Sequence, residues 1–152
     1  MKPRIVRHFG SLAIVAVLTS FAHADAPNGR YVVSAATVYD TKTKLTWQRT
    51  ISSSDSCPYT YANAKAYCST IGTSLGGTGW RLPTLKELLT LIDWSKTNQG
   101  FDTTAFPTQA NCYYWSATLL PGQTPERRWT IRPSGSILST PIDQVGTAMC
   151  VR

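Results

Sequence analysis

The sequence predicts an α+β domain, and three observations lead to this class. Two segments with helical spacing of apolar residues lie in the middle of the chain, and strand-like segments precede and follow them. A Thr-x-x-Glu motif marks the start of the second helical segment, and four cysteines are spread along the chain. Because the strands do not alternate with the helices, we expect an α+β domain whose terminal strands share an antiparallel sheet.

The first 24 residues are typical of a secretory signal peptide. An apolar run at 11–21 leads to Ala-His-Ala at 22–24, and three basic residues precede the run: Lys2, Arg4 and Arg7. The run is shorter than the roughly 20 residues of a membrane-spanning helix, so we expect no membrane insertion. Cleavage after Ala24 would leave one domain, 25–152, and predicts export to the periplasm or the extracellular space.

The composition of the predicted mature chain excludes several kinds of chemistry. Both histidines, His8 and His23, lie in the signal peptide, which excludes histidine-activated nucleophiles and histidine-ligated zinc or copper. The chain carries no calcium-loop motif, and no motif nominates a pair of glycosidase carboxylates. Loss of the signal peptide lowers the formal charge from +7 to about +4, below that of a dedicated nucleic-acid binder. We therefore expect no enzymatic activity, cofactor, metal or nucleic-acid partner.

The first strand-like segments predict a hairpin. Residues 31–39 are rich in valine, tyrosine and alanine and predict one strand. In 44–49, Leu45 and Trp47 alternate with polar residues, as in a half-buried strand. The polar residues 40–44 predict the turn that joins the two strands.

The first helix is predicted to begin after Thr60, whose hydroxyl can cap it. Its apolar residues recur at helical spacing: Tyr61, Ala64, Cys68 and Ile71. Gly72 predicts the end of this helix. Cys68 lies in the middle of the apolar face and would point to the core.

The motif Gly-Trp-Arg-Leu-Pro-Thr, which precedes the second helix, is interpreted as architecture and not as a ligand site. Pro83 ends an extended segment, Thr84 caps the helix, and Glu87 completes a capping box. The helix has an apolar face: Leu85, Leu88, Leu89 and Ile92. Trp80 would belong to the core, and Arg81 would hold the loop by hydrogen bonds or by pairing with an acidic residue.

The C-terminal third of the chain predicts short strands. They lie at 113–118, 128–132, 137–138 and 148–152. Tyr113 and Tyr114 would point to opposite sides of a strand, so only one of them can be buried on a given face. Tryptophans in strand or motif positions are predicted core residues: Trp47, Trp80, Trp115 and Trp129.

The four cysteines predict two disulfides. They are Cys57, Cys68, Cys112 and Cys150. An even number in an exported chain favours disulfides over thiol chemistry, and the spacing lacks the paired Cys-x-x-Cys motifs of zinc sites. Four cysteines allow three pairings, and the spacing alone does not choose between them.

Seven ordered blocks of the sequence resemble a known family. They are YDTKTKLTWQRT, YANAKAYC, GWRLPTLKELLTLID, FDTTAFP, YYWSAT, RWTIRPSG and MCVR, and they span 39–152. Their order and spacing are similar to those of the C-terminal domain of bacterial collagen-like adhesins, the Lcl-type domain. The resemblance implies a C-type-lectin-like fold, with two helices packed on small antiparallel sheets and the N- and C-terminal strands adjacent. It also implies a disulfide from the first helix to the last strand, Cys68–Cys150, and hence Cys57–Cys112. The family occurs in exported bacterial proteins, and its best-known member looks like an adhesin for sulfated polysaccharide.

The segment 126–132 contains the most suggestive charge pattern. Strand alternation predicts that Trp129 and Ile131 face inward. It predicts three outward residues: Arg128, Thr130 and Arg132. The two outward arginines would lie about 13 Å apart, and with Arg127 they could bind sulfate or carboxylate groups through bidentate guanidinium forks. A solvated strand edge with protective charges is the alternative.

Trp94 is a second kind of candidate, because on a helix continued from Leu85 it would lie opposite the leucine face. Followed by Lys96, it could offer an exposed ring for stacking against a sugar. We therefore expect an exported, non-catalytic binding module that recognises a polyanionic or other glycan at a cell surface or matrix. The alternative is a module that binds a surface protein or a peptide through 97–111 and 119–127.

Overall fold

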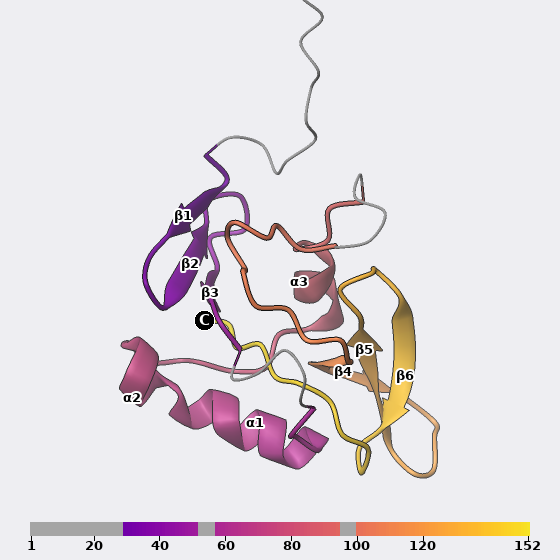
Figure 1. Ribbon diagram of the computed structural model, residues 1–152. Coiled ribbons are helices and arrows are strands. Elements are labelled where there is room, and N and C mark those ends of the chain that lie inside the picture. Colours follow the sequence, from indigo (N-terminus) through magenta and orange to yellow (C-terminus); the bar gives the residue numbers. More distant parts are fainter. Residues whose placement is uncertain (1–28, 52–56, 95–99) are drawn as a thin grey trace, which may run out of the picture.

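The structure is a computed structural model that describes residues 29–51, 57–94 and 100–152. The predicted signal peptide and Lys96 lie outside these ranges. The fold is α+β, as predicted, with two three-stranded antiparallel sheets. The elements are β1 (Tyr31–Val33), β2 (Thr37–Asp40), β3 (Thr46–Gln48), α1 (Tyr61–Thr70), α2 (Gly72–Leu75), α3 (Leu85–Leu89), β4 (Tyr114–Leu120), β5 (Arg127–Ile131) and β6 (Ile137–Pro141). The two sheets lie on different sides of the molecule, and the C-terminus lies near β3 (Figure 1).

The first sheet has the strand order β1-β2-β3. The predicted hairpin is present between β2 and β3, where Val38 is the partner of Trp47. The prediction of one strand over 31–39 is wrong, because the chain reverses within it. The backbone N–H of Ser34 donates to the carbonyl of Thr37 at 2.8 Å and closes a tight turn, so that β1 pairs antiparallel with β2.

The C-terminal segment joins the first sheet to the loop ahead of α3. Val151 forms isolated antiparallel bridges with Trp47 on one side and with Arg81 on the other. The predicted strand at 148–152 is therefore a short bridging segment and not a full strand. It makes the N- and C-terminal parts of the fold adjacent, and its neighbour is β3, not the first strand β1.

The first helix begins as predicted, and it ends at Thr70, just before the predicted stop at Gly72. The Thr60 side chain accepts a hydrogen bond from the backbone N–H of Asn63 and caps α1. A second short helix, α2, begins at Gly72 itself and ends at Leu75, with Gly76 as its C-cap at a φ of 75°. Gly72 is also needed for packing: a Cβ atom there would lie 2.6 Å from the carbonyl oxygen of Gly77 and 3.0 Å from Cδ1 of Trp80.

Replacing Gly72 with alanine is expected to lower the free energy of unfolding by about 1–3 kcal/mol. The added methyl group would meet backbone, which cannot rotate away as a flexible side chain could. Chemical denaturation of the variant would measure this loss. Thr73→Ala, at an exposed position in the same helix, is the matched control and should change stability by less than about 0.5 kcal/mol. Equal stability of the two variants would contradict the close approach at Gly72.

The capping box of the second helix is present. The Thr84 hydroxyl accepts from the backbone N–H of Glu87 at 3.2 Å, and Oε2 of Glu87 accepts from the backbone N–H of Thr84 at 2.7 Å. Arg81 donates to both carboxylate oxygens of Glu87, at 2.8 and 2.7 Å. These hydrogen bonds from Arg81, followed by that from Thr84, hold the pKa of Glu87 below its ordinary value. Arg81 thus holds the loop.

Helix α3 is shorter than the apolar pattern suggests. It ends at Leu89, and the backbone N–H groups of Leu91 and Ile92 bond three residues back to Leu88 and Leu89. Leu91 and Ile92 are nevertheless buried, because this tighter turn keeps them against the core.

The second sheet has the order β4-β5-β6, with β5 in the centre. The prediction that Thr130 faces solvent is wrong: Thr130 is fully buried, and its hydroxyl lies 2.8 Å from that of Thr140. The reason is that both faces of β5 are covered. Ile131 packs into a core cluster with Leu88 of α3, whereas Trp115, the cross-strand partner of Thr130, packs in a second cluster with α1.

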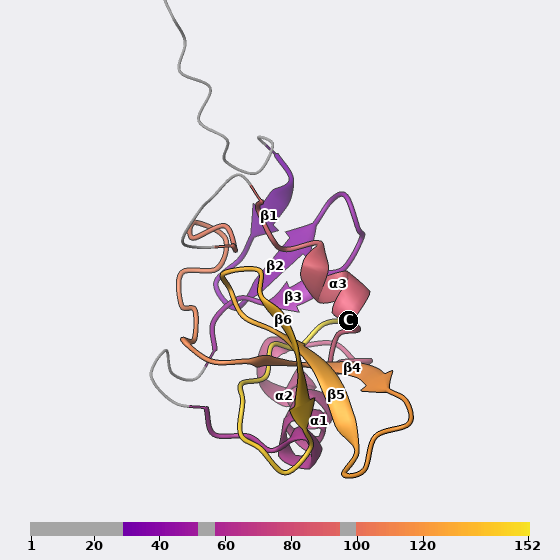
Figure 2. The ribbon, with the colours of Figure 1, turned by 90° about the vertical axis from the view of Figure 1, so that its right-hand side faces the viewer.

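The core consists of two clusters that meet at the C-terminal segment. Three of the predicted core tryptophans are buried, namely Trp47, Trp80 and Trp115, whereas Trp129 is only half-buried. Of the tyrosine pair, Tyr114 is buried and Tyr113 is half-buried, as the alternation requires. The view in Figure 2 shows α1 and α2 behind the second sheet and α3 beside β4. The C-type-lectin-like arrangement stays a prediction.

Candidate functional site

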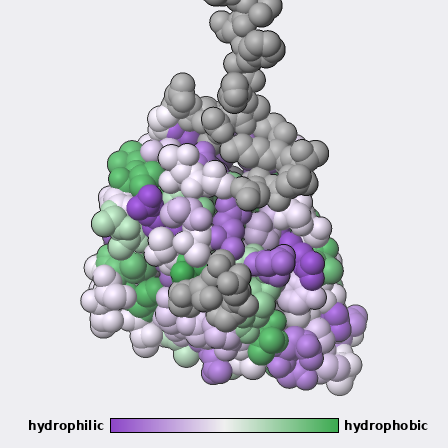
Figure 3. Space-filling view, viewed as in Figure 1, coloured by the Kyte–Doolittle hydropathy of each residue, from purple (hydrophilic) through white to green (hydrophobic). Residues whose placement is uncertain are grey.

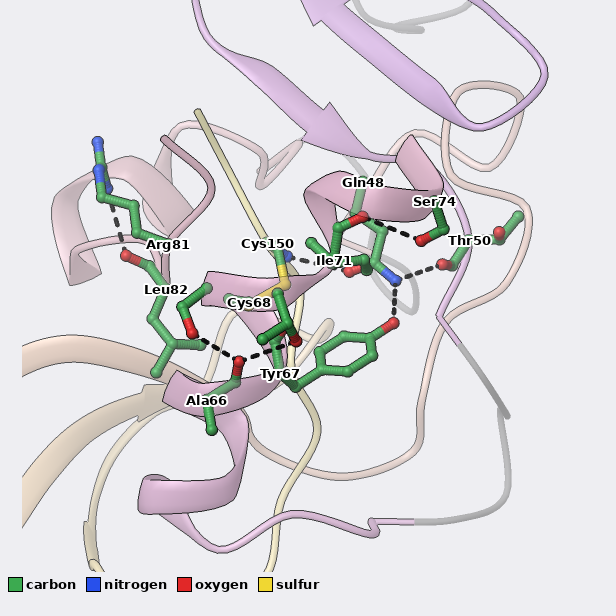
Figure 4. Close-up of a disulfide and its surroundings, with 12 residues drawn as sticks. Gln48, Thr50, Ala66, Tyr67, Cys68, Ile71, Ser74, Arg81, Leu82 and Cys150 are labelled. Carbon is green, nitrogen blue, oxygen red and sulfur yellow. Dashed lines mark hydrogen bonds between the residues drawn. A yellow bond between two sulfur atoms is a disulfide. The ribbon is translucent and has the colours of Figure 1, made fainter. Parts of the chain in front are cut away.

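Both disulfides have the pairing that the resemblance implies. Cys68 pairs with Cys150, with Cα atoms 5.3 Å apart, and Cys57 pairs with Cys112, with Cα atoms 6.2 Å apart. The Cys68–Cys150 disulfide ties α1 to the C-terminal segment, and the side chain of Gln48 lies next to it (Figure 4). Gln48 accepts from the backbone N–H of Cys150 at 3.2 Å and donates to the Tyr67 hydroxyl at 3.0 Å. The described cysteines therefore offer no thiol for chemistry.

Two of the three candidate arginines are occupied by contacts within the fold. Arg127 donates to the side chain and the carbonyl oxygen of Ser139 on β6. Arg128 forms an ion pair with Glu126 at 2.5 Å, donates to the carbonyl of Ala117 at 2.9 Å, and lies 4.4 Å from the ring centroid of Tyr61. These contacts hold both guanidinium groups against the sheet.

Arg132 differs from its two neighbours because it is exposed. Its guanidinium lies 4.9 Å from the ring centroid of Tyr113, which holds the planar group without using its hydrogen-bond donors. It begins the turn that joins β5 to β6, closed by hydrogen bonds between Arg132 and both Gly135 and Ser136. Among the described residues, no carboxylate forms an ion pair with Arg132.

Trp94 lies at the same turn. A Cβ atom on Gly135 would lie 3.0 Å from the six-membered ring of Trp94, so the indole packs directly on the turn backbone. The side chain remains 69% exposed, as predicted, although α3 has already ended at Leu89. The fold thus brings Trp94 and Arg132 to one end of the second sheet, which we call the β5–β6 turn site, and leaves Arg127 and Arg128 at the other end of β5.

Exposed charge on the described residues is mostly positive. Seven basic side chains are exposed: Lys42, Lys44, Lys65, Arg81, Lys86, Arg132 and Arg152. Two acidic side chains are exposed, Glu126 and Asp143, and Glu126 is paired with Arg128. Hydrophilic and hydrophobic residues alternate over the face seen in Figure 3, without one large apolar patch.

The loops of the alternative hypothesis differ in character. From Phe101 to Ala110, the first loop contributes four buried residues to the core: Phe101, Ala105, Phe106 and Ala110. The second loop is shorter than 119–127, because β4 ends at Leu120 and β5 begins at Arg127, and all six residues between them are exposed. Of the two loops, only the second has every described residue exposed, so that its whole described length can contact a partner.

Perturbed pKa values in the described chain have structural causes. Burial raises the pKa of Tyr114 to about 12, and its hydroxyl accepts from the backbone N–H of Ala110. Burial of Asp40 opposes its ionisation, yet hydrogen bonds from Arg30 and from the following turn hold its pKa below the ordinary value. The described residues contain no group of three or more side chains suited to a metal ion.

One hollow in the structure has no counterpart in the sequence analysis. It lies where α1, α2 and the loop before Trp80 meet, and its volume is about 500 Å³. Arg152 lies at its edge, with its guanidinium 5.4 Å from the ring centroid of Trp80. In the sequence, this region is marked by the glycine-rich stretch 76–79. Such a stretch predicts a flexible loop as readily as a ligand-binding loop.

None of the helices in the described ranges has the length and apolar character needed to span a bilayer. No curated protein and no solved structure is similar enough to the chain to count as a match. The family model of the Lcl C-terminal domain does match, and it covers residues 36–152. That range includes the capping box, both disulfides, the second sheet and the bridging C-terminal segment, and the chain therefore belongs to the Lcl C-terminal domain family.

Proposed function

We propose that this protein is an exported, non-catalytic binding module that recognises a polyanionic glycan at a cell surface or matrix. Membership of the Lcl C-terminal domain family suggests a surface-associated domain, and this family is not a known catalytic one. The two disulfides fit an oxidising compartment. The observation that supports a polyanionic ligand is the excess of exposed basic over exposed acidic side chains among the described residues.

The β5–β6 turn site is the proposed contact point. Arg132 offers the five donors of a guanidinium, because stacking on Tyr113 orients its plane without consuming them. Trp94 offers an exposed indole face from the same turn. A sulfated or carboxylated sugar could place its anionic group on the guanidinium and a ring face on the indole. Arg127 and Arg128 would support the sheet instead of contacting ligand.

Chromatography of the mature domain on immobilised heparin tests this proposal. We expect elution above about 0.15 M salt, where exposed charges are already screened beyond about 8 Å. Arg132→Ala should weaken binding roughly five-fold, which corresponds to about 1 kcal/mol for one exposed ion pair. Lys86→Ala removes the same charge from α3 and is the matched control. An equal shift in both variants would indicate bulk charge and contradict the site, and elution below 0.15 M would contradict the ligand class.

A further inference from the structure

The hollow beside α2 has the size of a small-molecule site. We call it the α1–α2 groove, and it is lined by Ser69, Thr70, Gly72, Thr73, Gly77, Thr78, Gly79 and Trp80. Its volume of about 500 Å³ falls within the usual range of 300–1,000 Å³ for ligand pockets. Helix α2, which carries Gly72 and Thr73 of the lining, lies away from β5 and β6 in Figure 1. None of its lining residues takes part in the site proposed above.

Besides the indole N–H of Trp80, the polar side-chain groups that line the groove are hydroxyls, and most of them are left with hydrogen-bond acceptors. Four lining residues carry hydroxyl groups, and three of these already donate within the helices. Ser69 donates to the carbonyl of Ala66 at 2.7 Å, and Thr70 to that of Tyr67 at 3.1 Å. Thr73 donates to the carbonyl of Thr70 at 3.1 Å. A hydroxyl has one hydrogen and two lone pairs, so these oxygens still accept and favour a ligand with many donors.

The wall of the groove is held in place by tight packing. The indole N–H of Trp80 donates to the carbonyl of Gly76 at 2.9 Å. Gly72 lets α2 approach both this ring and the backbone of Gly77. The Cys68–Cys150 disulfide joins α1 to the neighbouring C-terminal segment. A ligand would therefore meet a preformed surface and would not have to order it.

A single positive charge stands at the edge of the groove. The guanidinium of Arg152 lies over Trp80, and a Cβ atom on Gly77 would come within 2.6 Å of its Nη1 atom. Arg152 is exposed, and no carboxylate among the described residues forms an ion pair with it. Since a guanidinium has donors and no acceptor, it complements an anionic group on the ligand.

We propose that the α1–α2 groove binds an acidic monosaccharide unit, with the sugar hydroxyls on Ser69, Thr70 and Thr73 and the carboxylate on Arg152. A bare anion would offer no hydrogen-bond donors to the hydroxyl oxygens. A neutral sugar would leave the charge of Arg152 unused, and an apolar ligand would leave the hydroxyl oxygens unpaired. This inference does not depend on the β5–β6 turn site.

Titration of the mature domain with glucuronate and with glucose, followed by ¹H–¹⁵N NMR, tests the groove. We expect saturable shifts with glucuronate at millimolar concentration, at residues 69–80, and about five-fold weaker binding of glucose. Thr78→Trp should abolish binding by filling the groove. Arg152→Gln should reduce the affinity for glucuronate to that for glucose, whereas Lys65→Gln, which removes an exposed charge from α1 outside the groove, should change nothing.

The outcomes separate the two sites. Arg132→Ala should leave glucuronate binding unchanged, so that loss of heparin retention and loss of groove binding can be told apart. Unchanged melting temperatures would show that the Thr78→Trp and Arg152→Gln variants are folded. The inference is overturned if glucuronate gives no saturable shifts, if Thr78→Trp still binds, or if Arg152→Gln and Lys65→Gln behave alike.

Discussion

Replacing both Cys68 and Cys150 with alanine is expected to lower the free energy of unfolding by about 5 kcal/mol. The bond joins residues 82 positions apart, and in the chain-entropy model a loop of this length contributes about 4.5 kcal/mol. Both side chains are also fully buried in the cluster that contains Trp80 and Trp115, so removal of the sulfur atoms loses packing as well. This bond anchors the segment that bridges β3 to the loop before α3.

Replacing Cys57 and Cys112 with alanine is the matched control. This bond spans 55 positions, for which the same model gives about 4.2 kcal/mol, nearly the same entropic contribution. Cys57 is only half-buried, so less packing is lost. Urea denaturation of both double variants should therefore show a larger loss, by about 1 kcal/mol, for the Cys68–Cys150 pair. Equal losses, or the reverse order, would contradict a special packing role for that disulfide.

Replacing Arg30 with methionine is expected to cost about 3 kcal/mol at pH 7, because it leaves a buried carboxylate without its cation. Asp40 is fully buried and accepts from Nε and Nη2 of Arg30 at 3.2 and 2.8 Å. The same Nη2 atom donates to the carbonyl of Thr90 at 2.6 Å and so ties the first sheet to the end of α3. Lys42→Met, at an exposed cation in the neighbouring turn, should change stability by less than about 0.5 kcal/mol.

The pH dependence of this effect has a defined sign. In the native protein the pKa of Asp40 is lowered, so its contribution to stability is present above the unfolded value, about 3.9, and is lost as the pH falls through the folded value. In the variant, burial opposes ionisation without Arg30 to offset it. The difference in stability between the native protein and Arg30→Met should therefore be largest at neutral pH and shrink as the pH falls toward and through about 4. A difference that is constant from pH 7 to pH 3 would contradict this role of Asp40.

Local features of the fold were predictable from the sequence because they depend on residues a few positions apart. Thr84 and Glu87 satisfy each other's backbone groups within one turn, and Thr60 caps α1 in the same way. The reversal at Ser34 was missed because Ser-Ala-Ala lacks the glycine, proline or asparagine that usually signals a turn. The cysteine pairing came from the family resemblance, since spacing alone left three possibilities open.

The candidate site could be predicted only in part. The sequence indicated that Trp94 would be exposed, and it is. It also placed Arg128 and Arg132 together on the outward face with Arg127 nearby, although the surroundings of these three arginines differ. Arg127 and Arg128 find partners on β6, β4 and α1, which are remote in sequence, whereas Arg132 stacks on Tyr113 and its guanidinium donates to none of the described residues. Strand alternation also predicted wrongly that Thr130 faces solvent. Alternation shows which residues share a face of a strand, but it does not show that both faces of β5 are buried.

The sequence by itself determined the α+β class, the starts of α1 and α3, the number of disulfides and the absence of histidine from the described chain. Each of these follows from composition or from contacts between near neighbours. Only the tertiary structure decided which cations remain exposed, that Trp94 rests on Gly135, and that Arg152 borders a groove next to α2. These depend on contacts between segments far apart in the chain, which hydrophobic periodicity and motif spacing do not encode.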